Sequence, residues 1–332
     1  MDVVRPFVKW AGGKGSLIPQ ITKYYPFELK NGRIEKYVEP FVGGGAVLID
    51  ILQKYEVQEA YAFDINKDLI NCYNVIKSNV ENLIQELEKK EKEFLCLDNE
   101  KRKNYFYDVR EEYNSYTLET EPNVKRASEF IFLNRTCFNG LYRVNRNGKF
   151  NVPFGKYKNP TICDSSNLRN LSKLIKDVVF EYGDYKKSEE LIDAHTFVYF
   201  DPPYRPLSDT SAFTSYTKEV FNDEKQKELA EYFNLLSTRN AKLMLSNSNP
   251  KNVDANDNFF ENIYKGFNIN EVSAKRMINS NSEGRGEISE LLITNYEEWD
   301  FFNDIKSNQL YTFSMTDIIN PFVIFLTFLM FL

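Results

Sequence analysis

The tetrapeptide Asp201-Pro202-Pro203-Tyr204 combines groups that could hold a small planar substrate. Its two prolines fix φ and remove two amide donors, which leaves a stiff segment with carbonyl oxygens to offer. Asp201 adds a second acceptor, and Tyr204 adds a flat ring face. One planar amino group, such as the exocyclic amine of a nucleobase, would fit between these acceptors and stack on the ring. An ordinary strand-to-loop turn, capped by Asp201 and stiffened by the prolines, explains the same residues equally well.

The apolar residues 197–200 precede this tetrapeptide and predict a buried strand. Asp201 would then lie at the carboxyl end of a strand, where open α/β sheets bind their ligands. The polar residues 246–249 follow another predicted strand, 241–245, in the same way. After Tyr204, residues 207–216 form a loop long enough to close over a pocket. The tetrapeptide therefore stands where a ligand site is expected.

The glycine turn at residues 43–45 is a second candidate site, between a predicted strand at 37–42 and a predicted helix at 46–52. Glycines let backbone amides approach a ligand closely. The next predicted strand ends in Asp64, at a distance typical of an acid that holds ribose hydroxyls. Because the pattern is not G-x-G-x-x-G, an adenosine-containing ligand without a pyrophosphate fits better than a dinucleotide. The alternative is a tight turn followed by a helix that Asp64 caps.

A basic segment, residues 123–158, stands out in a chain of net charge −6. It contains eight Lys or Arg residues and one Glu, and aromatic residues are interleaved with them, among them Phe138, Tyr142, Phe150 and Phe154. Basic residues interleaved with aromatic ones favour binding to a polyanion. The pair Asn147-Gly148 between alternating residues predicts a β-hairpin. Such a ribbon could enter a DNA major groove, with Arg143 at a guanine edge and Asn139 at another base edge, or it could merely cover the sheet.

The length of 332 residues and the 42% of apolar residues predict one large α/β domain or a domain with a sizeable insertion. Strands and helices alternate up to a helix at 66–79, and polar helices follow over 80–118, clearest at 81–92. An amphipathic helix is expected at 122–134, and the alternation returns with a strand at 178–180 and a helix at 222–236. Two antiparallel strands at 268–277 and 287–294 would close the sheet, joined by a loop whose Arg285 could meet a phosphate.

Several classes of protein are disfavoured by what the chain lacks. Four cysteines without a C-x-x-C pair indicate a reducing cytoplasm and neither zinc nor a disulfide framework. The one histidine, His195, removes most metal sites and weakens any Ser/His/Asp scheme, so no metal is expected. No signal peptide is recognised, and the apolar residues 321–332 are fewer than the roughly 20 that a membrane-spanning helix needs. We therefore expect no membrane partner.

Five segments in register resemble the DNA adenine-N6 methyltransferases of the Dam family, in the D12 class, which include GATC-specific modification methylases. These segments are residues 7–14 (FVKWAGGK), 39–45 (EPFVGGG), 63–66 (FDIN), 133–155 (LNRTCFNGLYRVNRNGKFNVPFG) and 201–204 (DPPY). The resemblance implies an α/β fold with a Rossmann-like S-adenosylmethionine-dependent methyltransferase sheet, formed by residues 1–66 and 176–297. Residues 67–175 would be an inserted, mainly helical target-recognition domain with the β-hairpin, and residues 298–332 a tail outside the resemblance.

The resemblance also implies roles for individual residues. Those expected around S-adenosyl-L-methionine, with Asp64 on the ribose, are Trp10, Lys14, Glu39, Phe41, Gly43, Gly45, Asp64 and Asp201. Asp201, Pro202 and Tyr204 would hold the target adenine, flipped out of the duplex. Those expected to touch double-stranded DNA are Lys9, Phe138, Asn139, Leu141 and Arg143.

The implied activity is transfer of a methyl group from S-adenosylmethionine to N6 of adenine in duplex DNA, within GATC. A restriction endonuclease that acts on the same site is an expected partner. A cytosine-N4 or RNA amino methyltransferase stays open, because the geometry around the amino group is shared. So does a catalytically silent DNA-binding protein that retains the cofactor pocket. A nucleotide-dependent oxidoreductase is weaker, since the pyrophosphate fingerprint is missing.

Overall fold

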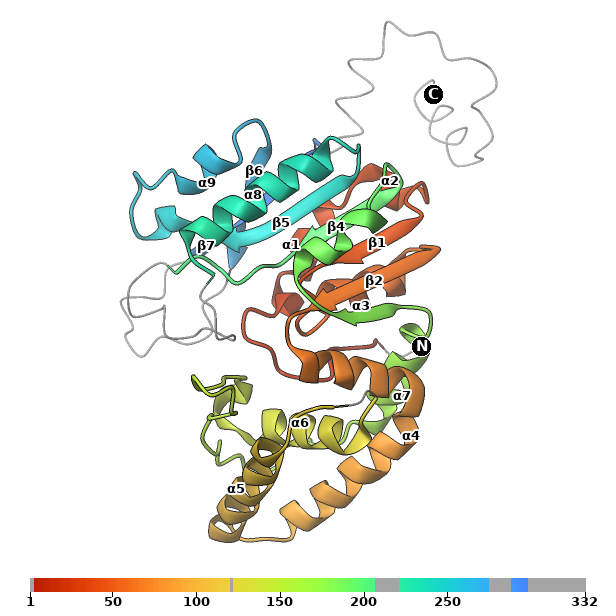
Figure 1. Cartoon of the computed structure of the whole chain (residues 1–332), viewed down its shortest axis with the longest axis vertical. Helices are drawn as coiled ribbons and strands as arrows, with labels where there is room; N and C mark the ends of the chain where they lie inside the picture. Colours follow the sequence, from red (N-terminus) through yellow and green to blue (C-terminus); the bar gives the residue numbers. More distant parts are fainter. Residues whose placement is uncertain (1–2, 120–121, 207–220, 275–287, 298–332) are drawn as a thin grey trace, which may run out of the picture. The chain divides into compact units, whose positions relative to one another are not determined.

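A mixed β-sheet is the centre of the computed structural model, which describes residues 3–119, 122–206, 221–274 and 288–297 (Figure 1). Its strand order is β3-β2-β1-β4-β5-β7-β6. The strands are β1 (Lys36–Glu39), β2 (Glu59–Asp64), β3 (Val179–Tyr182), β4 (Thr196–Phe200), β5 (Lys242–Ser248), β6 (Asn268–Ala274) and β7 (Ile288–Thr294). β1 to β5 are parallel, whereas β7 lies antiparallel between β5 and β6. The predicted α/β class and the two closing strands are therefore confirmed.

The residues of β4 show why the strands form here. All five are buried, as expected for a central parallel strand covered on both faces. Successive side chains alternate between two apolar clusters: Phe197 and Tyr199 pack on one face of the sheet, and Val198 and Phe200 on the other. This central strand fixes the position of the tetrapeptide that follows it.

The polar residues after position 245 correct one prediction. Ser246, Asn247 and Ser248 lie inside β5 rather than beyond its end, because β7 pairs with β5 as far as Ser248. Asn247 is fully buried, and its side-chain amide donates to Gln226 Oε1 at 3.1 Å. A polar residue can be buried in a strand when its groups are hydrogen-bonded in this way.

Helices flank the sheet and continue beyond it (Figure 1). The α-helices of the described residues are α1 (Ile18–Ile21), α2 (Phe27–Lys30), α3 (Ala46–Lys54), α4 (Lys67–Leu95), α5 (Asn99–Ser115), α6 (Val124–Thr136), α7 (Ser165–Leu174), α8 (Asp223–Ser237) and α9 (Phe259–Ile263). Short 3₁₀ segments cover Lys14–Ser16, Thr22–Tyr24, Phe138–Gly140, Tyr185–Leu191 and Pro250–Asn252. Asparagine caps begin three of the longer helices, with Asn66 before α4, Asn123 before α6 and Asn222 before α8.

Helix α4 replaces the two helices predicted at 66–79 and 81–92. It is one helix with a kink at Asn79, whose φ of −139° and ψ of 36° are not helical. α4 contacts β2 and β3 and packs against α6 and α7. The apolar core of α4 to α7 is continuous with one face of the sheet. The boundaries of an insertion at 67–175 stay a prediction, and the tail at 298–332 lies outside the described residues.

Candidate active site

The crevice between β1 and β4 is where the sheet order reverses direction. β1 is followed along one side of the sheet by β2 and β3, whereas β4 starts the other side. Val38 and Val198 are paired in register, so Glu39 at the end of β1 and Asp201 just after β4 lie at the same edge of the sheet. Such a switch point at the carboxyl ends of parallel strands is the usual ligand site of this class of sheet.

Lys14 lies in this crevice and contacts two residues of the tetrapeptide. Its ammonium is 2.7 Å from Asp201 Oδ1 and 4.6 Å from the centre of the Tyr204 ring. It also donates to the Gly12 carbonyl at 2.6 Å, and only 3% of the side chain is exposed. A positively charged nitrogen thus stands between an acceptor and a ring face, which is the arrangement predicted for a substrate amino group.

Burial controls the electrostatics of the two acids. It raises the pKa of Asp201 to about 6, although the nearby Lys14 ammonium opposes this rise. Glu39 is 2% exposed and accepts a hydrogen bond from the Tyr37 hydroxyl at 2.7 Å. Burial raises the pKa of Glu39 well above its usual range. The crevice is therefore a partly dehydrated acidic site in which charges interact strongly.

Three further residues hold the tetrapeptide, and the sequence analysis did not find them. Gln226 of α8 donates to the Pro203 carbonyl at 3.0 Å, and the Tyr204 hydroxyl donates to the Glu290 carboxylate of β7. Arg205 pairs with two aspartates and continues the chain from Tyr204. Sequence pattern alone gives no signal for Gln226 or Glu290, because both lie in ordinary helix and strand runs.

The glycine turn is organised by Asp64. Gly43 N donates to Asp64 Oδ2 at 3.0 Å, and Asn66 N donates to Asp64 Oδ1 at 2.8 Å. Gly43 and Gly45 have φ values of +47° and +70°, which favour glycine. Burial raises the pKa of Asp64 to about 6. The side chain that caps α4 is Asn66, so capping by Asp64 does not explain this acid.

Aromatic rings form the walls beside this turn. A Cβ at Gly43 would lie 2.8 Å from Trp10 Nε1, so the indole packs directly on the turn. Trp10 stacks on Tyr142 with ring centres 5.8 Å apart, and Phe41 stacks on Tyr185 at 5.4 Å. The structure thus brings the predicted cofactor residues into two adjoining groups, one at the glycine turn and one at Asp201.

The predicted DNA contacts lie mainly on the surface. Phe138 is 51% exposed, and Asn139 is exposed with a φ of +55°. Lys9 and Arg143 are also exposed, whereas Leu141 is half-buried. The Asn134 side chain accepts from Lys9 N at 2.9 Å and donates to the carbonyls of Lys9 and Gly140. It therefore places Lys9 beside the turn that carries Phe138 and Asn139.

The predicted hairpin is not a continuous two-stranded ribbon. Residues 137–155 form isolated antiparallel bridges at Cys137↔Phe154 and Val144↔Phe150. A turn is closed where Asn145 N donates to the Lys149 carbonyl at 2.8 Å. Side chains of α5 bind the returning segment at the backbone of Phe150 and Val152.

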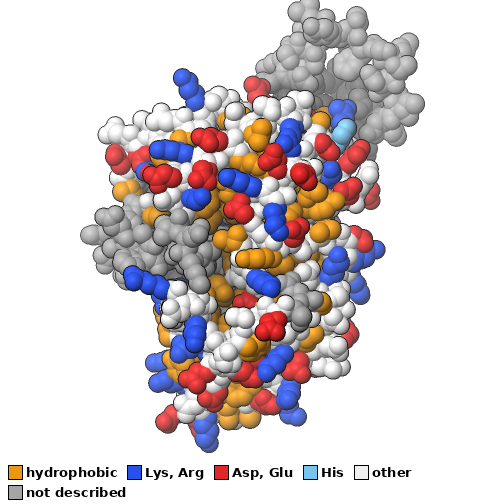
Figure 2. Space-filling view, in the orientation of Figure 1, with side chains coloured by type: hydrophobic (Ala, Val, Ile, Leu, Met, Phe, Trp, Pro, Cys, Tyr) orange, Lys and Arg blue, Asp and Glu red, His pale blue; other side chains and the backbone are white. Residues whose placement is uncertain are grey.

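Fewer basic side chains of residues 123–158 are available for binding DNA than the charge count suggests. Arg126 is buried in an ion pair with Asp68, Arg135 donates to the Phe7 carbonyl, and Lys125 pairs with Glu112. The interleaved rings of Tyr142, Phe150 and Phe154 are core residues, which leaves only Phe138 exposed. Besides Arg135, the basic residues of this segment that form no ion pair with another described residue are Arg143, Arg146, Lys149, Lys156 and Lys158. Figure 2 shows Lys and Arg side chains over this part of the molecule and over α5.

Neither a cluster of metal ligands nor a membrane-spanning helix is found in the part of the chain that the structure describes. There, no three His, Cys, Asp or Glu side chains gather as metal ligands would. No described helix is both long and apolar enough to cross a membrane. Residues 207–216, which were expected to close over a pocket, and Arg285, which was expected to meet a phosphate, lie outside the described residues.

The sheet order and the acidic crevice at its switch point define an α/β protein of the nucleotide-binding type and are consistent with a methyltransferase fold. Residues 10–278 match the family model for D12 class N6 adenine-specific DNA methyltransferases. The chain belongs to this family, so the resemblance drawn from its sequence is confirmed.

Three relatives show how far the similarity extends. Type II methyltransferase M.MjaIII of Methanocaldococcus jannaschii is 55% identical over 294 residues, which cover 88% of this chain and 99% of that protein. Type II methyltransferase M1.LlaDCHI of Lactococcus lactis subsp. cremoris is 38% identical, over 88% and 96% of the two chains. The DNA adenine methylase of Haemophilus influenzae is 34% identical, over 87% and 92%.

Proposed function

We propose that this protein transfers a methyl group from S-adenosylmethionine to N6 of adenine within GATC in duplex DNA. The single observation that carries the proposal is Asp201, paired with the buried Lys14 beside Tyr204 at the switch point of the sheet. An adenine flipped into this crevice would bring its amino group to Asp201 and its ring to Tyr204. Flipping costs a few kcal/mol, and stacking of about 1 to 3 kcal/mol offsets much of that cost.

The chemistry expected of Asp201 follows from the electronic structure of adenine. The lone pair of N6 is delocalised into the ring, which makes the amino group a poor nucleophile. When the Asp201 carboxylate and the Pro202 carbonyl accept its two N–H bonds, the lone pair is localised toward the methyl donor. Acceptors already in place also stabilise the positive charge that develops on N6. Gln226 and Glu290 would hold the Pro203–Tyr204 segment in the required position.

The residues around the glycine turn suit S-adenosylmethionine. Gly43 and Gly45 hold the turn in a left-handed conformation packed against Trp10 and Tyr73, while Trp10 and Phe41 would offer ring faces to a ligand. Asp64 would hold the ribose, and the buried Glu39 and Asp201 would favour the positively charged sulfonium. When bound, the cofactor supplies an activated methyl group. Lys14 would turn toward it when the target amino group takes its place on Asp201.

The DNA contacts proposed for this chain are Lys9, Phe138, Asn139, Leu141 and Arg143. Four of them are exposed and lie along or beside the segment that follows α6, with unpaired basic residues around them. Arg143 would read a guanine edge and the lysines would hold phosphates. The name Type II methyltransferase carried by two relatives supports a place in a restriction-modification system, with an endonuclease for the same site. A cytoplasmic location, where bacterial and archaeal DNA is found, suits four cysteines that form no disulfide.

Protection of plasmid DNA tests this function. The plasmid is incubated with the protein and S-adenosylmethionine, and is then digested with two endonucleases, one specific for unmethylated GATC and one for adenine-methylated GATC. We expect resistance to the first enzyme and cleavage by the second, and neither change with the Asp201→Asn variant. Unaltered digestion with the wild-type protein would contradict GATC as the target.

A further inference from the structure

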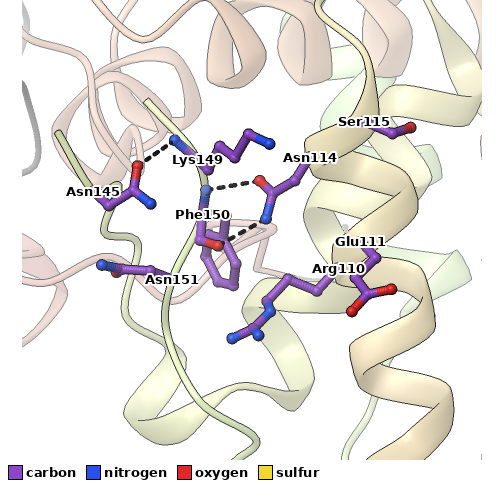
Figure 3. A pocket seen from close by; sticks show the side chains of 8 residues that line it. All are labelled: Arg110, Glu111, Asn114, Ser115, Asn145, Lys149, Phe150 and Asn151. Atoms are coloured by element: carbon purple, nitrogen blue, oxygen red, sulfur yellow. Dashed lines mark hydrogen bonds between the residues drawn. The ribbon is translucent and has the colours of Figure 1, made fainter. Parts of the chain in front are cut away.

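Helix α5 holds the segment at residues 143–151 through the side chain of Asn114 (Figure 3). Asn114 Nδ2 donates to the Phe150 carbonyl at 2.9 Å, and Asn114 Oδ1 accepts from Phe150 N at 2.8 Å. One side-chain amide thus binds both backbone groups that a neighbouring strand would otherwise bind. Because the two bonds share one rigid amide plane, they fix the position of Phe150 along α5 as well as its distance from it.

A second side chain of α5 repeats this contact one turn away. Arg110 donates to the Val152 carbonyl at 3.4 Å. Arg110 and Asn114 are four residues apart on the helix, which corresponds to about 6 Å. Phe150 and Val152 are two residues apart in an extended chain, which corresponds to about 6.6 Å. The matching spacings let α5 bind alternate residues of the returning segment.

The position of Phe150 determines that of Arg143 through hydrogen bonds between the two paired segments. Val144 and Phe150 form an isolated bridge, and Asn151 N donates to the Arg143 carbonyl at 3.1 Å. The Arg143 side chain in turn donates from Nε to Asn151 Oδ1 at 2.8 Å. Both the backbone and the guanidinium of Arg143 are therefore oriented by residues next to the one that Asn114 holds.

Apolar packing does not fix this position by itself. The Phe150 ring packs against Tyr113 and Tyr142, at 6.3 and 5.8 Å between ring centres, but apolar contact has little directional preference. A cleft of about 360 Å³ lies between α5 and the turn. The residues around it are Arg110, Glu111, Asn114, Ser115, Asn145, Lys149, Phe150 and Asn151 (Figure 3). Phe106 of α5 also packs on Phe154, with ring centres 5.6 Å apart, and the hydrogen bonds from α5 add directional contacts to this packing.

We propose that Asn114 is a positioning residue for base recognition: it aligns residues 143–151 on α5 and, through Phe150 and Asn151, directs Arg143. This role rests on the proposed function, in which Arg143 reads a base. According to this proposal, helix α5 contributes to the choice of DNA sequence although it supplies none of the proposed DNA contacts.

Methylation mapping tests the role of Asn114. Plasmid DNA is methylated by the wild-type protein and by Asn114→Ala, and rates are compared at the preferred sequence and at sequences that differ from it by one base pair. We expect the preference to fall roughly ten- to a hundredfold, the discrimination supplied by one bidentate base contact. Binding of S-adenosylmethionine, measured by calorimetry, should not change. Asn104→Ala, at an exposed position on the same helix, is the matched control and should keep the wild-type preference.

A preference that is unchanged in Asn114→Ala would overturn the proposal, and so would an equal fall in rate at all sequences, which a purely structural role predicts. Asn114→Asp keeps an acceptor for Phe150 N but loses the donor to the carbonyl, so it should lose part of the preference. If the alanine variant does not fold, an unchanged preference in the aspartate variant overturns the role. Clear sequence preference in the wild-type protein shows that the proposed function holds even where the role of Asn114 fails. An inactive wild-type protein overturns both.

Discussion

Lys14 and Asp201 form an ion pair, 2.7 Å long, in which Lys14 is buried and Asp201 lies immediately beyond the carboxyl end of β4. The pair joins two segments that are far apart in the sequence, residues 7–14, which contain Lys14, and residues 201–204, which begin with Asp201. It also shows that the crevice accepts a nitrogen cation or an amino group between Asp201 and the Tyr204 ring. The following predictions depend on this arrangement and on the elements that support it.

Replacing Asp201 with Asn should reduce the rate of methyl transfer by roughly a hundred- to a thousandfold, because the amino group loses a charged acceptor in the transition state. Binding to duplex DNA should stay within about twofold of the wild type, since the contacts proposed for DNA lie elsewhere. Single-turnover transfer of a radiolabelled methyl group and fluorescence anisotropy measure the two quantities. Asp177→Asn, at a side chain that is 83% exposed, is the control. Near-normal transfer by Asp201→Asn would remove this residue from the mechanism.

Activity should depend on the ionisation of Asp201. Its pKa in the folded protein is about 6, so the carboxyl becomes protonated below that pH and accepts hydrogen bonds less strongly. We expect kcat/KM for DNA to fall about tenfold for each pH unit below 6 and to level off above it. A flat profile between pH 5 and pH 8 would show that the ionised carboxylate is not required.

The raised pKa values of Asp64 and Asp201 should make the protein less stable as the pH rises, whereas activity should increase over the same range. Asp64 and Asp201 keep a proton to about pH 6 in the folded protein, whereas their usual pKa is 3.8. Between these values the folded state binds more protons than the unfolded state, so their contribution to the free energy of unfolding falls as the pH rises. Urea unfolding at pH 4.5 and pH 6.5 should show that Asp64→Asn weakens this decline. An equal pH dependence in the variant and the wild type would contradict it.

Gly45 should not tolerate a side chain. Its φ is +70°, and an added Cβ would lie 2.5 Å from the Tyr73 hydroxyl. We expect Gly45→Ala to lower the free energy of unfolding by at least about 1 to 2 kcal/mol, the cost of the left-handed backbone alone. Tyr73→Phe removes the clashing oxygen and should recover part of the loss in the double variant. Gly15→Ala, with nothing within 4 Å of the added Cβ, is the control in the same unfolding experiment. Absence of any recovery would argue against the steric contact.

Two bidentate ion pairs provide a test of burial. Arg126 and Asp68 have side chains that are 8% and 15% exposed, whereas Arg169 and Glu81 are 45% and 59% exposed. Asp68→Ala should destabilise the protein by about 3 to 5 kcal/mol, because it leaves the buried guanidinium uncompensated. Glu81→Ala should change the unfolding midpoint very little. Similar effects of the two variants would show that the α4–α6 pair is not dehydrated.

The strands, and the position of the Asp201–Tyr204 tetrapeptide at the end of one of them, were predictable because each depends on neighbouring residues. β4 is an apolar run that stops at Asp201, and the Gly43 turn follows an apolar strand in the same way. Asn247 could not be placed, since its burial inside β5 depends on Gln226, which lies in a different element. Local composition cannot show such a partner.

The basic segment illustrates the same limit for charge. Arg126 and Arg146 are equivalent in a count of charges, but one is buried on Asp68 and the other is exposed. Likewise Tyr142 and Phe150 are core residues, although they alternate with basic ones as stacking residues would. Asn114 carries no signal at all in the sequence, because its two hydrogen bonds join residues that are 36 positions apart.

The most direct test is the identity of the methylated nucleoside. Duplex DNA is incubated with the wild-type protein and S-adenosylmethionine that carries a labelled methyl group, digested to nucleosides and separated by chromatography. We predict that the label appears in N6-methyladenine and that Asp201→Asn leaves the DNA almost unlabelled. Label in N4-methylcytosine, or no label with a folded wild-type protein, would contradict the assignment of the crevice at Asp201 to adenine methylation.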